Sequence, residues 1–139
     1  MWTKTISQTT KLATKEQIWK LFADVNNWNK WDDGIEYAQM EGDFIAGNHF
    51  ILKPKDGPKV KIKLIETVKN RKFVDLTVFP LAKMTGTHIF EETPDGLKMT
   101  TTMQVTGLLS ALWVKLVASK IVAHLPEEMQ HQAEYASKL

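Results

Sequence analysis

The 139-residue chain contains no cysteine, which excludes disulfide bonds, thiolate catalysis and cysteine-ligated metal sites. The N-terminal 17 residues also lack the apolar core of a secretory signal peptide. Absence of cysteine fits a reducing compartment, so we expect a cytoplasmic protein.

Arginine and long apolar runs are scarce as well. Arg71 is the single arginine, and the formal net charge is only +2. Specific nucleic-acid readers rely on arginine for bidentate contacts, so we expect no nucleic-acid partner. The most apolar stretch, residues 108–125, is interrupted by Lys115, Lys120 and His124, which argues against a transmembrane segment.

The remaining composition is that of an ordinary globular protein, with 43% hydrophobic and 24% charged residues. Its length fits one domain, which we place at residues 1–139. A chain of this size buries roughly 68–70% of its unfolded surface, enough for a core and an internal cavity.

The first third of the chain predicts a strand and two short helices. Residues 2–9 are rich in threonine and favour a strand. Thr14 and Gln17 form a capping box that begins a helix over residues 15–25. The tryptophan pair of the NNWNKW sequence, three residues apart, suits one further helical turn. We expect these two rings to anchor that turn, although they could also stack on a ligand.

From residue 35 the pattern changes to short apolar runs with turn residues every 8–12 positions, as in antiparallel strands. We predict strands at residues 35–40, 48–53, 60–68, 72–79, 85–92 and 97–106. Two of them alternate clearly between apolar and polar residues, so one face of the sheet is covered and the other solvated. Lys59, Lys61 and Lys63 belong to the solvated face; a role in binding anionic ligands is the less favoured alternative.

The last third predicts a long helix. Apolar residues recur there at three- and four-residue steps: Leu109, Leu112, Trp113, Leu116, Val117 and Ile121. Pro126, followed by two glutamates, predicts a kink or a helix restart. A helix with one broad apolar face needs a large surface, and a curved sheet would supply it.

The order of these elements, together with local motifs, resembles the START-like superfamily. That superfamily includes polyketide cyclases/dehydrases, lipid-transfer domains and birch-pollen-allergen-like proteins. The matching positions are ATKEQIWKLFADV, NNWNKW, Gly96 with Met99, Gly107, and Leu125-Pro126. The resemblance implies an α+β helix-grip fold: a curved antiparallel sheet of about seven strands around a long C-terminal helix, with two short helices after the first strand.

The resemblance also implies a pocket between sheet and helix, with its mouth framed by residues 54–58, 80–83 and 107–110. We expect it to bind a small hydrophobic molecule, such as a lipid, isoprenoid or aromatic metabolite, without a cofactor. The alternative is a polyketide cyclase/dehydratase-type enzyme in which His88 acts as acid or base. A third possibility is a filled concavity, with the exposed edge of the long helix contacting a protein partner.

Two-residue parity on the strands and the helical stripe select the residues expected to face this pocket. They are Tyr37, Phe50, Ile62, Leu64, Leu76, His88, Phe90, Met99, Met103, Val105, Leu112, Trp113, Leu116 and Ile121. Methionines at several of these positions could adapt to varied guests or simply fill the core, and the pattern does not favour either interpretation.

His88 is the one histidine expected inside the pocket. A core histidine hydrogen-bonded to a neighbour is the favoured interpretation over a catalytic one. Glu36, Glu66 and Asp75 are candidate partners, but parity secures none of them. The remaining histidines predict no metal site, since those at 124 and 131 lack a third ligand and the one at 49 begins a strand at the surface.

Overall fold

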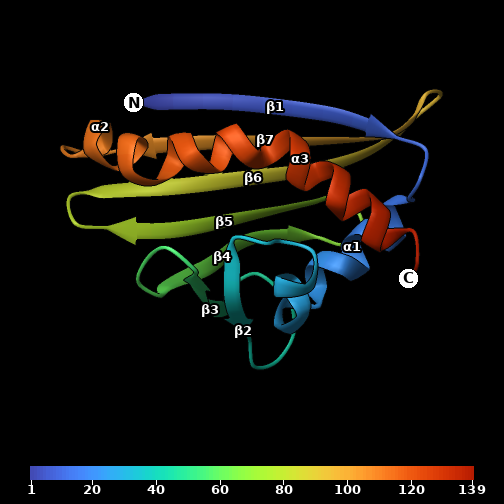
Figure 1. Cartoon of the computed structure of the whole chain (residues 1–139), viewed down its shortest axis with the longest axis horizontal. Helices are drawn as coiled ribbons and strands as arrows, with labels where there is room; N and C mark the ends of the chain where they lie inside the picture. Colours follow the sequence, from blue (N-terminus) through green and yellow to red (C-terminus); the bar gives the residue numbers. More distant parts are fainter.

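The computed structural model describes all residues, 1–139. Its seven strands form one antiparallel sheet with the order β1-β7-β6-β5-β4-β3-β2, which curls around the C-terminal helix (Figure 1). The strands are β1 Trp2–Thr10, β2 Ile35–Gln39, β3 His49–Pro54, β4 Val60–Val68, β5 Lys72–Phe79, β6 Ala82–Thr93 and β7 Gly96–Thr106. This arrangement confirms the predicted helix-grip fold.

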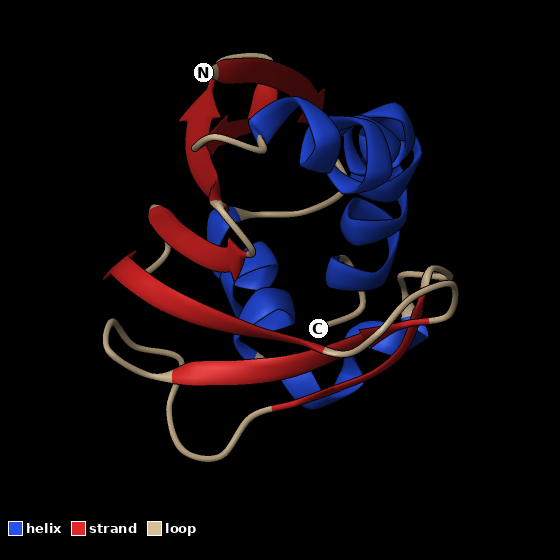
Figure 2. Ribbon diagram, turned by 90° about the vertical axis from the view of Figure 1, so that its left-hand side faces the viewer, coloured by secondary structure: helices blue, strands red, loops and turns tan.

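Two short helices separate β1 from β2, and three helical segments follow β7. The first pair is α1 Lys15–Ala23 and the 3-10 helix η1 Val25–Lys30. The last three are α2 Ser110–Trp113, the π-helical turn η2 Val114–Ala118, and α3 Ser119–Ala136. Figure 2 shows the strands curling around one side of the molecule with the C-terminal helices facing them. None of the helices is long and apolar enough to cross a membrane.

Helix α1 begins where its capping box predicts. The Thr14 N–H donates to Gln17 Oε1 at 2.9 Å, and the Gln17 N–H donates to Thr14 Oγ1 at 3.2 Å. These two bonds satisfy donors that the first helical turn leaves without backbone partners. The helix ends at Ala23 rather than residue 25, because the chain passes into η1 there.

The C-terminal helix differs from the prediction in two ways. Of the two alternatives predicted at Pro126, the restart is wrong, because α3 is continuous across the proline. The helix does bend, since its second half turns toward α1 (Figure 1). The irregularity lies earlier, in the π-helical turn η2. A π turn has i→i+5 hydrogen bonds and more residues per turn, so it shifts the phase of the residues that follow. The buried positions are therefore Ala118, Leu125, Met129, Gln132, Ala133 and Ala136.

The apolar core divides into two clusters along the concave face of the sheet. The larger one joins α1, η1 and the end of α3 to the sheet and includes Trp19, Phe22 and Phe73. The smaller one lies nearer α2 and is formed by Met84, Met103, Val105, Ala118 and Leu125. Phe90 of β6 belongs to the first cluster and Met84 of the same strand to the second. Between them, the residues on the same face of β6 are Gly86 and His88.

Candidate functional site

Three polar side chains from adjacent strands meet on the concave face between the two apolar clusters. The register pairs Phe73 with His88 across β5 and β6, and His88 with Thr101 across β6 and β7. Asp75 lies two residues after Phe73 and therefore points to the same face. We call Asp75, His88 and Thr101 the polar belt.

Hydrogen bonds join the three members of the polar belt. His88 Nε2 lies 2.9 Å from Asp75 Oδ2, and His88 Nδ1 lies 3.3 Å from Thr101 Oγ1. A carboxylate can only accept, so Nε2–H donates to Asp75, which leaves Nδ1 to accept from the threonine hydroxyl. Both ring nitrogens thus have hydrogen-bond partners within the protein. These two bonds fix the His88 ring. The second carboxylate oxygen of Asp75, Oδ1, does not bond to the ring and can accept a hydrogen bond from another group.

Packing holds the histidine ring in the same place. The Phe73 ring stacks on it with centroids 4.2 Å apart and an interplanar angle of 12°. Gly86 lies next to the pair, where a Cβ would be 2.9 Å from Asp75 Oδ1 and 3.1 Å from His88 Nε2. Only glycine lets the backbone approach the two side chains this closely. Gly86 of β6 lies between Asp75 of β5 and Met103 of β7, and its lack of a side chain leaves room for the carboxylate.

Two members of the polar belt, Asp75 and His88, are partly exposed. The side chains of Asp75 and His88 each keep 16% of their surface exposed, although their strand neighbours Phe73 and Phe90 are almost fully buried. An exposed carboxylate edge within an apolar wall favours a guest that donates one hydrogen bond and buries carbon atoms around it.

The sequence matches, over residues 1–133, the family described as "Polyketide cyclase / dehydrase and lipid transport". The chain belongs to this family. The resemblance predicted from the motifs is thereby confirmed. No curated protein sequence matches the chain.

Solved structures show the same fold at low sequence identity. A START superfamily protein from Mycobacterium smegmatis aligns with TM-score 0.69 and 15% identity over 96% of this chain and 97% of that one. Ara h 8.0201 aligns with TM-score 0.74 and 14% identity over 99% of this chain and 100% of that one. The di-domain ARO/CYC protein StfQ of the steffimycin biosynthetic pathway aligns with TM-score 0.71 and 15% identity over 98% of this chain and 49% of that one.

Most strand residues predicted to face inward do so in this member of the polyketide cyclase and lipid transport family. The register with the belt strands places eight of them on the concave face: Phe50, Ile62, Leu64, His88, Phe90, Met99, Met103 and Val105. Their placement follows from clear alternation on β4 and β7. Contact of these residues with a ligand stays a prediction.

Two strand residues predicted to face the pocket lie on the opposite face. Leu76 pairs with Thr85 and Lys63, one residue out of phase with Asp75. β5 has apolar residues on both faces, so its alternation did not reveal which set points inward. Tyr37 pairs with Lys53 on the outer face, because a register shift between Ile35 and Tyr37 changes the parity of β2.

The helical residues predicted to face the pocket also lie elsewhere in the structure. Leu112, Leu116 and Ile121 are exposed. The π turn includes Leu116 and precedes Ile121, so a regular 3.6-residue period does not describe the positions of these two residues. Trp113 is half-buried, and its ring stacks on Phe79 with centroids 4.4 Å apart. It therefore joins α2 to the end of β5.

Two of the three segments expected at the pocket mouth meet at this end of the molecule. The Trp113 Nε1–H donates to the Pro80 carbonyl at 2.9 Å, and the Leu109 N–H donates to the Leu81 carbonyl at 3.0 Å. A shallow groove of about 440 Å³ lies there, lined by Val78, Phe79, Leu81, Ala82, Lys83, Thr106 and Gly107. Residues 54–58 do not line it. A larger groove of about 710 Å³ lies elsewhere, beside β2 and β3, with mainly polar walls that include His49.

A second group of titratable residues joins α3 to the turn after η1. Burial, and next the charge of Asp32, raise the pKa of Glu128 to about 7, whereas His131 opposes the shift. Burial likewise raises the pKa of Asp32. Glu128 Oε1 is 4.0 Å from His131 Nδ1, while Glu128 Oε2 has no hydrogen-bond partner. No group of three histidine or acidic side chains in the structure has the geometry to hold a metal ion.

The two tryptophans of η1 and its cap are anchors. Trp28 and Trp31 are buried in the larger cluster. The Trp28 ring packs edge-on against Phe50 with ring centroids 5.0 Å apart, and the Trp31 ring packs edge-on against Phe22 with ring centroids 5.5 Å apart. The structure thus supports the anchoring interpretation over a ligand-stacking one.

Sequence reasoning missed two contributions to the site and left a third unresolved. Asp75 was one of three possible partners for His88, and Gly86 and Thr101 were not considered. One signal was available: Asp75 is the single charged residue inside β5 after its first position. A lone acid in an otherwise apolar strand indicates a buried polar contact.

Proposed function

We propose that the protein binds a small apolar molecule that carries a hydrogen-bond donor, such as a hydroxylated aromatic compound, isoprenoid or lipid. The guest would lie on the concave face, with its donor bonded to the Asp75 carboxylate. One observation supports this most strongly: a partly exposed carboxylate, fixed by His88, lies between two apolar clusters. The family's description, which includes lipid transport, agrees with such a role.

Two energetic terms would contribute to binding. Burial of apolar surface supplies about 25 cal/mol for each Å² removed from water. A hydrogen bond to a charged group adds about 1.5–3 kcal/mol, which corresponds to a preference of roughly ten- to a hundredfold for a guest with a donor. The first term sets affinity, and the second selects among guests of similar shape.

Native mass spectrometry of gently purified protein, followed by solvent extraction, tests this function. We expect an extra mass that is released by solvent and belongs to an apolar compound with a hydroxyl or amine. Met103→Trp should abolish it by filling the concave face next to Gly86. Ile45→Trp is the matched control, because residue 45 is exposed outside the sheet. Retention of the same guest by Met103→Trp would contradict a site on the concave face.

A second candidate is a proton-transfer enzyme of the cyclase/dehydratase type, and one observation favours it. The Asp75–His88 hydrogen bond would stabilise an imidazolium, and the long 3.3 Å contact to Thr101 leaves Nδ1 open to displacement by a substrate hydroxyl. The two candidates differ in their response to His88→Gln. If turnover of a polyketide-type ketone is lost while affinity for it is kept, the protein is an enzyme.

A further inference from the structure

One end of the molecule presents four exposed leucines. Leu108 is 88% exposed and Leu81 is 62% exposed, and Leu112 and Leu116 of the following helix are also exposed. We call these four residues the leucine tip. They lie together because the Leu109 N–H donates to the Leu81 carbonyl, which joins the β7–α2 connection to the β5–β6 turn.

Leu81 is exposed at a backbone cost. Its φ is +58°, in the left-handed region, at the second position of the two-residue turn between Phe79 and Ala82. Turns that begin with proline and continue with a positive φ normally use glycine or asparagine there. Leucine at this position is strained and gains no burial. Neither folding stability nor turn geometry explains the choice of this side chain.

The segments that carry the leucine tip have charges of one sign only. Lys83, Lys115 and Lys120 are exposed next to it in the sequence. No aspartate or glutamate occurs in residues 76–90 or 96–126, which include every residue of the tip. These segments are therefore apolar at their projecting leucines, and the charged side chains that they carry are basic.

We infer that the leucine tip docks this protein reversibly on membrane surfaces that contain anionic lipids. Leucines that project from separate segments fit insertion into the fluid boundary between lipid headgroups and acyl chains. Lysines around them fit the negative potential of an anionic leaflet. Docking depends only on the outer surface of α2, η2 and the β5–β6 turn, so it is independent of the ligand proposed for the concave face.

Vesicle flotation tests the inference with the full chain. We expect wild-type protein to float with phosphatidylcholine vesicles that contain phosphatidylglycerol, much less with pure phosphatidylcholine, and less at high salt. Leu108→Ser combined with Leu112→Ser should lower the partition coefficient by about tenfold or more, through lost apolar burial. Lys83→Gln combined with Lys115→Gln should lower it by about 25-fold, at roughly fivefold for each lysine.

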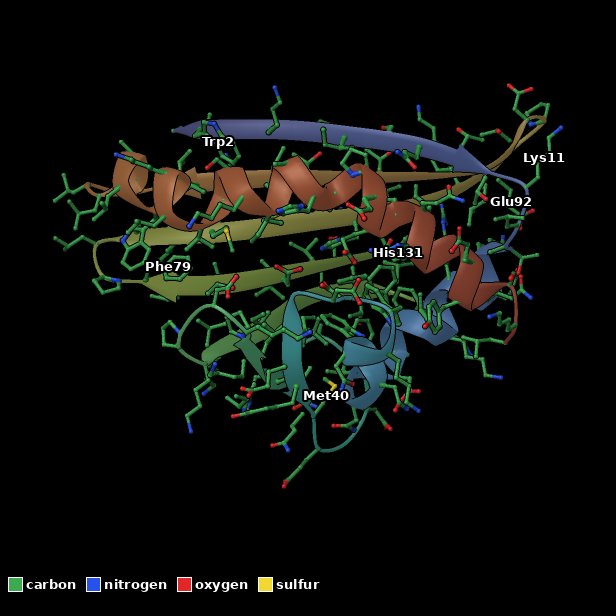
Figure 3. All side chains as sticks on the ribbon, viewed as in Figure 1. Trp2, Lys11, Met40, Phe79, Glu92 and His131 are labelled. Carbon is green, nitrogen blue, oxygen red and sulfur yellow. The ribbon has the colours of Figure 1, made fainter.

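The matched controls lie outside the leucine tip. Figure 3 shows Lys11 at the end of the molecule opposite Phe79, and Lys98 pairs with Thr9 of β1, close to Lys11. Leu12→Ser combined with Ile45→Ser removes two exposed apolar side chains outside the tip, and Lys11→Gln with Lys98→Gln removes two lysines. Neither control should change flotation. Circular dichroism confirms that each variant is folded.

Three results would overturn the inference: no flotation of the wild type on anionic vesicles, flotation that the tip variants keep, or flotation that the control pairs lose equally. Light scattering after size exclusion adds a fourth. A dimer that dissociates in Leu108→Ser/Leu112→Ser, without vesicle binding, would show that a second copy of the chain covers the tip.

Discussion

Gly86 and Asp75 face each other across β5 and β6 so closely that no larger residue fits: a Cβ on Gly86 would lie 2.9 Å from Asp75 Oδ1 and 3.0 Å from Oδ2. Both carboxylate oxygens thus lie close to the α-carbon of Gly86, and Oδ2 also bonds to His88. The position of the carboxylate depends on the absence of a side chain in the neighbouring strand.

Gly86→Ala should displace the carboxylate and break the Asp75–His88 hydrogen bond. We expect the free energy of unfolding to fall by about 1–3 kcal/mol, the usual cost of forcing an extra methyl into a packed site. Urea denaturation measures this loss, and the ring ¹⁵N shifts of His88 report the lost bond. Thr87→Ala, one residue along on the other face, should change neither by much.

The acceptor role of Asp75 predicts selectivity between guests of equal shape. Wild-type protein should bind 2-naphthol about tenfold or more tightly than naphthalene, because a charged acceptor strengthens the hydrogen bond to the hydroxyl. Asp75→Asn should lower this ratio severalfold and leave naphthalene affinity nearly unchanged. Calorimetric or fluorescence titration gives both constants. If the ratio survives in Asp75→Asn but falls in the exposed-loop control Asp56→Asn, Asp75 is not the acceptor.

Glu128 predicts a pH dependence of stability. Its pKa is raised from 4.5 to about 7, so the folded protein holds a proton that the unfolded chain has released. Its contribution to stability is therefore fully present below pH 4.5 and is lost as the pH rises toward 7 and above. Because the side chain is partly solvated, we expect a loss of only about 1 kcal/mol.

Glu128→Gln should remove this dependence and stabilise the protein at pH 8 relative to wild type. Urea denaturation at pH 5 and pH 8 for both proteins isolates the contribution. Glu127→Gln, an exposed neighbour in the same helix, is the control and should follow the wild-type curve. If Glu128→Gln also follows it, the buried carboxyl does not retain its proton near neutral pH.

The contacts of Trp113 with Phe79 and Pro80 hold α2 against the sheet, so substitutions of Trp113 should lower stability. Trp113→Phe keeps an aromatic ring against Phe79 but loses the hydrogen bond to Pro80, so it should cost about 1 kcal/mol. Trp113→Ala loses the stack as well and should cost about 3 kcal/mol. Hydrogen exchange should show the loss first in the amides of α2. Equal costs for both variants would assign the whole effect to the hydrogen bond.

The sequence predicted the inward face best where polar and apolar residues alternate strictly. In β4 and β7, lysines and threonines between the apolar residues left one choice, and Ile62 and Met103 point inward as expected. In β5, Val74 and Leu76 are as apolar as Phe73, so alternation gave no direction. The register with β6 then decides that Asp75 points inward, and register is a tertiary property.

Two further sets of residue orientations were predicted wrongly, for local reasons that the apolar pattern of the sequence does not show. The bulge in β2 reverses the parity expected for Tyr37. The π turn of η2 leaves Leu116 exposed, because a regular helical period does not describe that segment. Capping and turn residues, which act within four positions of one another, were predicted correctly: Thr14 and Gln17 form the box that begins α1.

Binding on the concave face is the central claim, and methyl NMR of methionine tests it most directly. The chain has six methionines, of which Met84 and Met103 are buried in the cluster beside the polar belt, while Met1 and Met40 lie outside both clusters' buried cores. On titration of ¹³C-methyl-methionine protein with 2-naphthol, we expect the Met84 and Met103 signals to shift in a saturable manner and those of Met1 and Met40 to stay in place. Shifts confined to Met1 or Met40, or no saturable shift at all, would contradict a ligand site on the concave face.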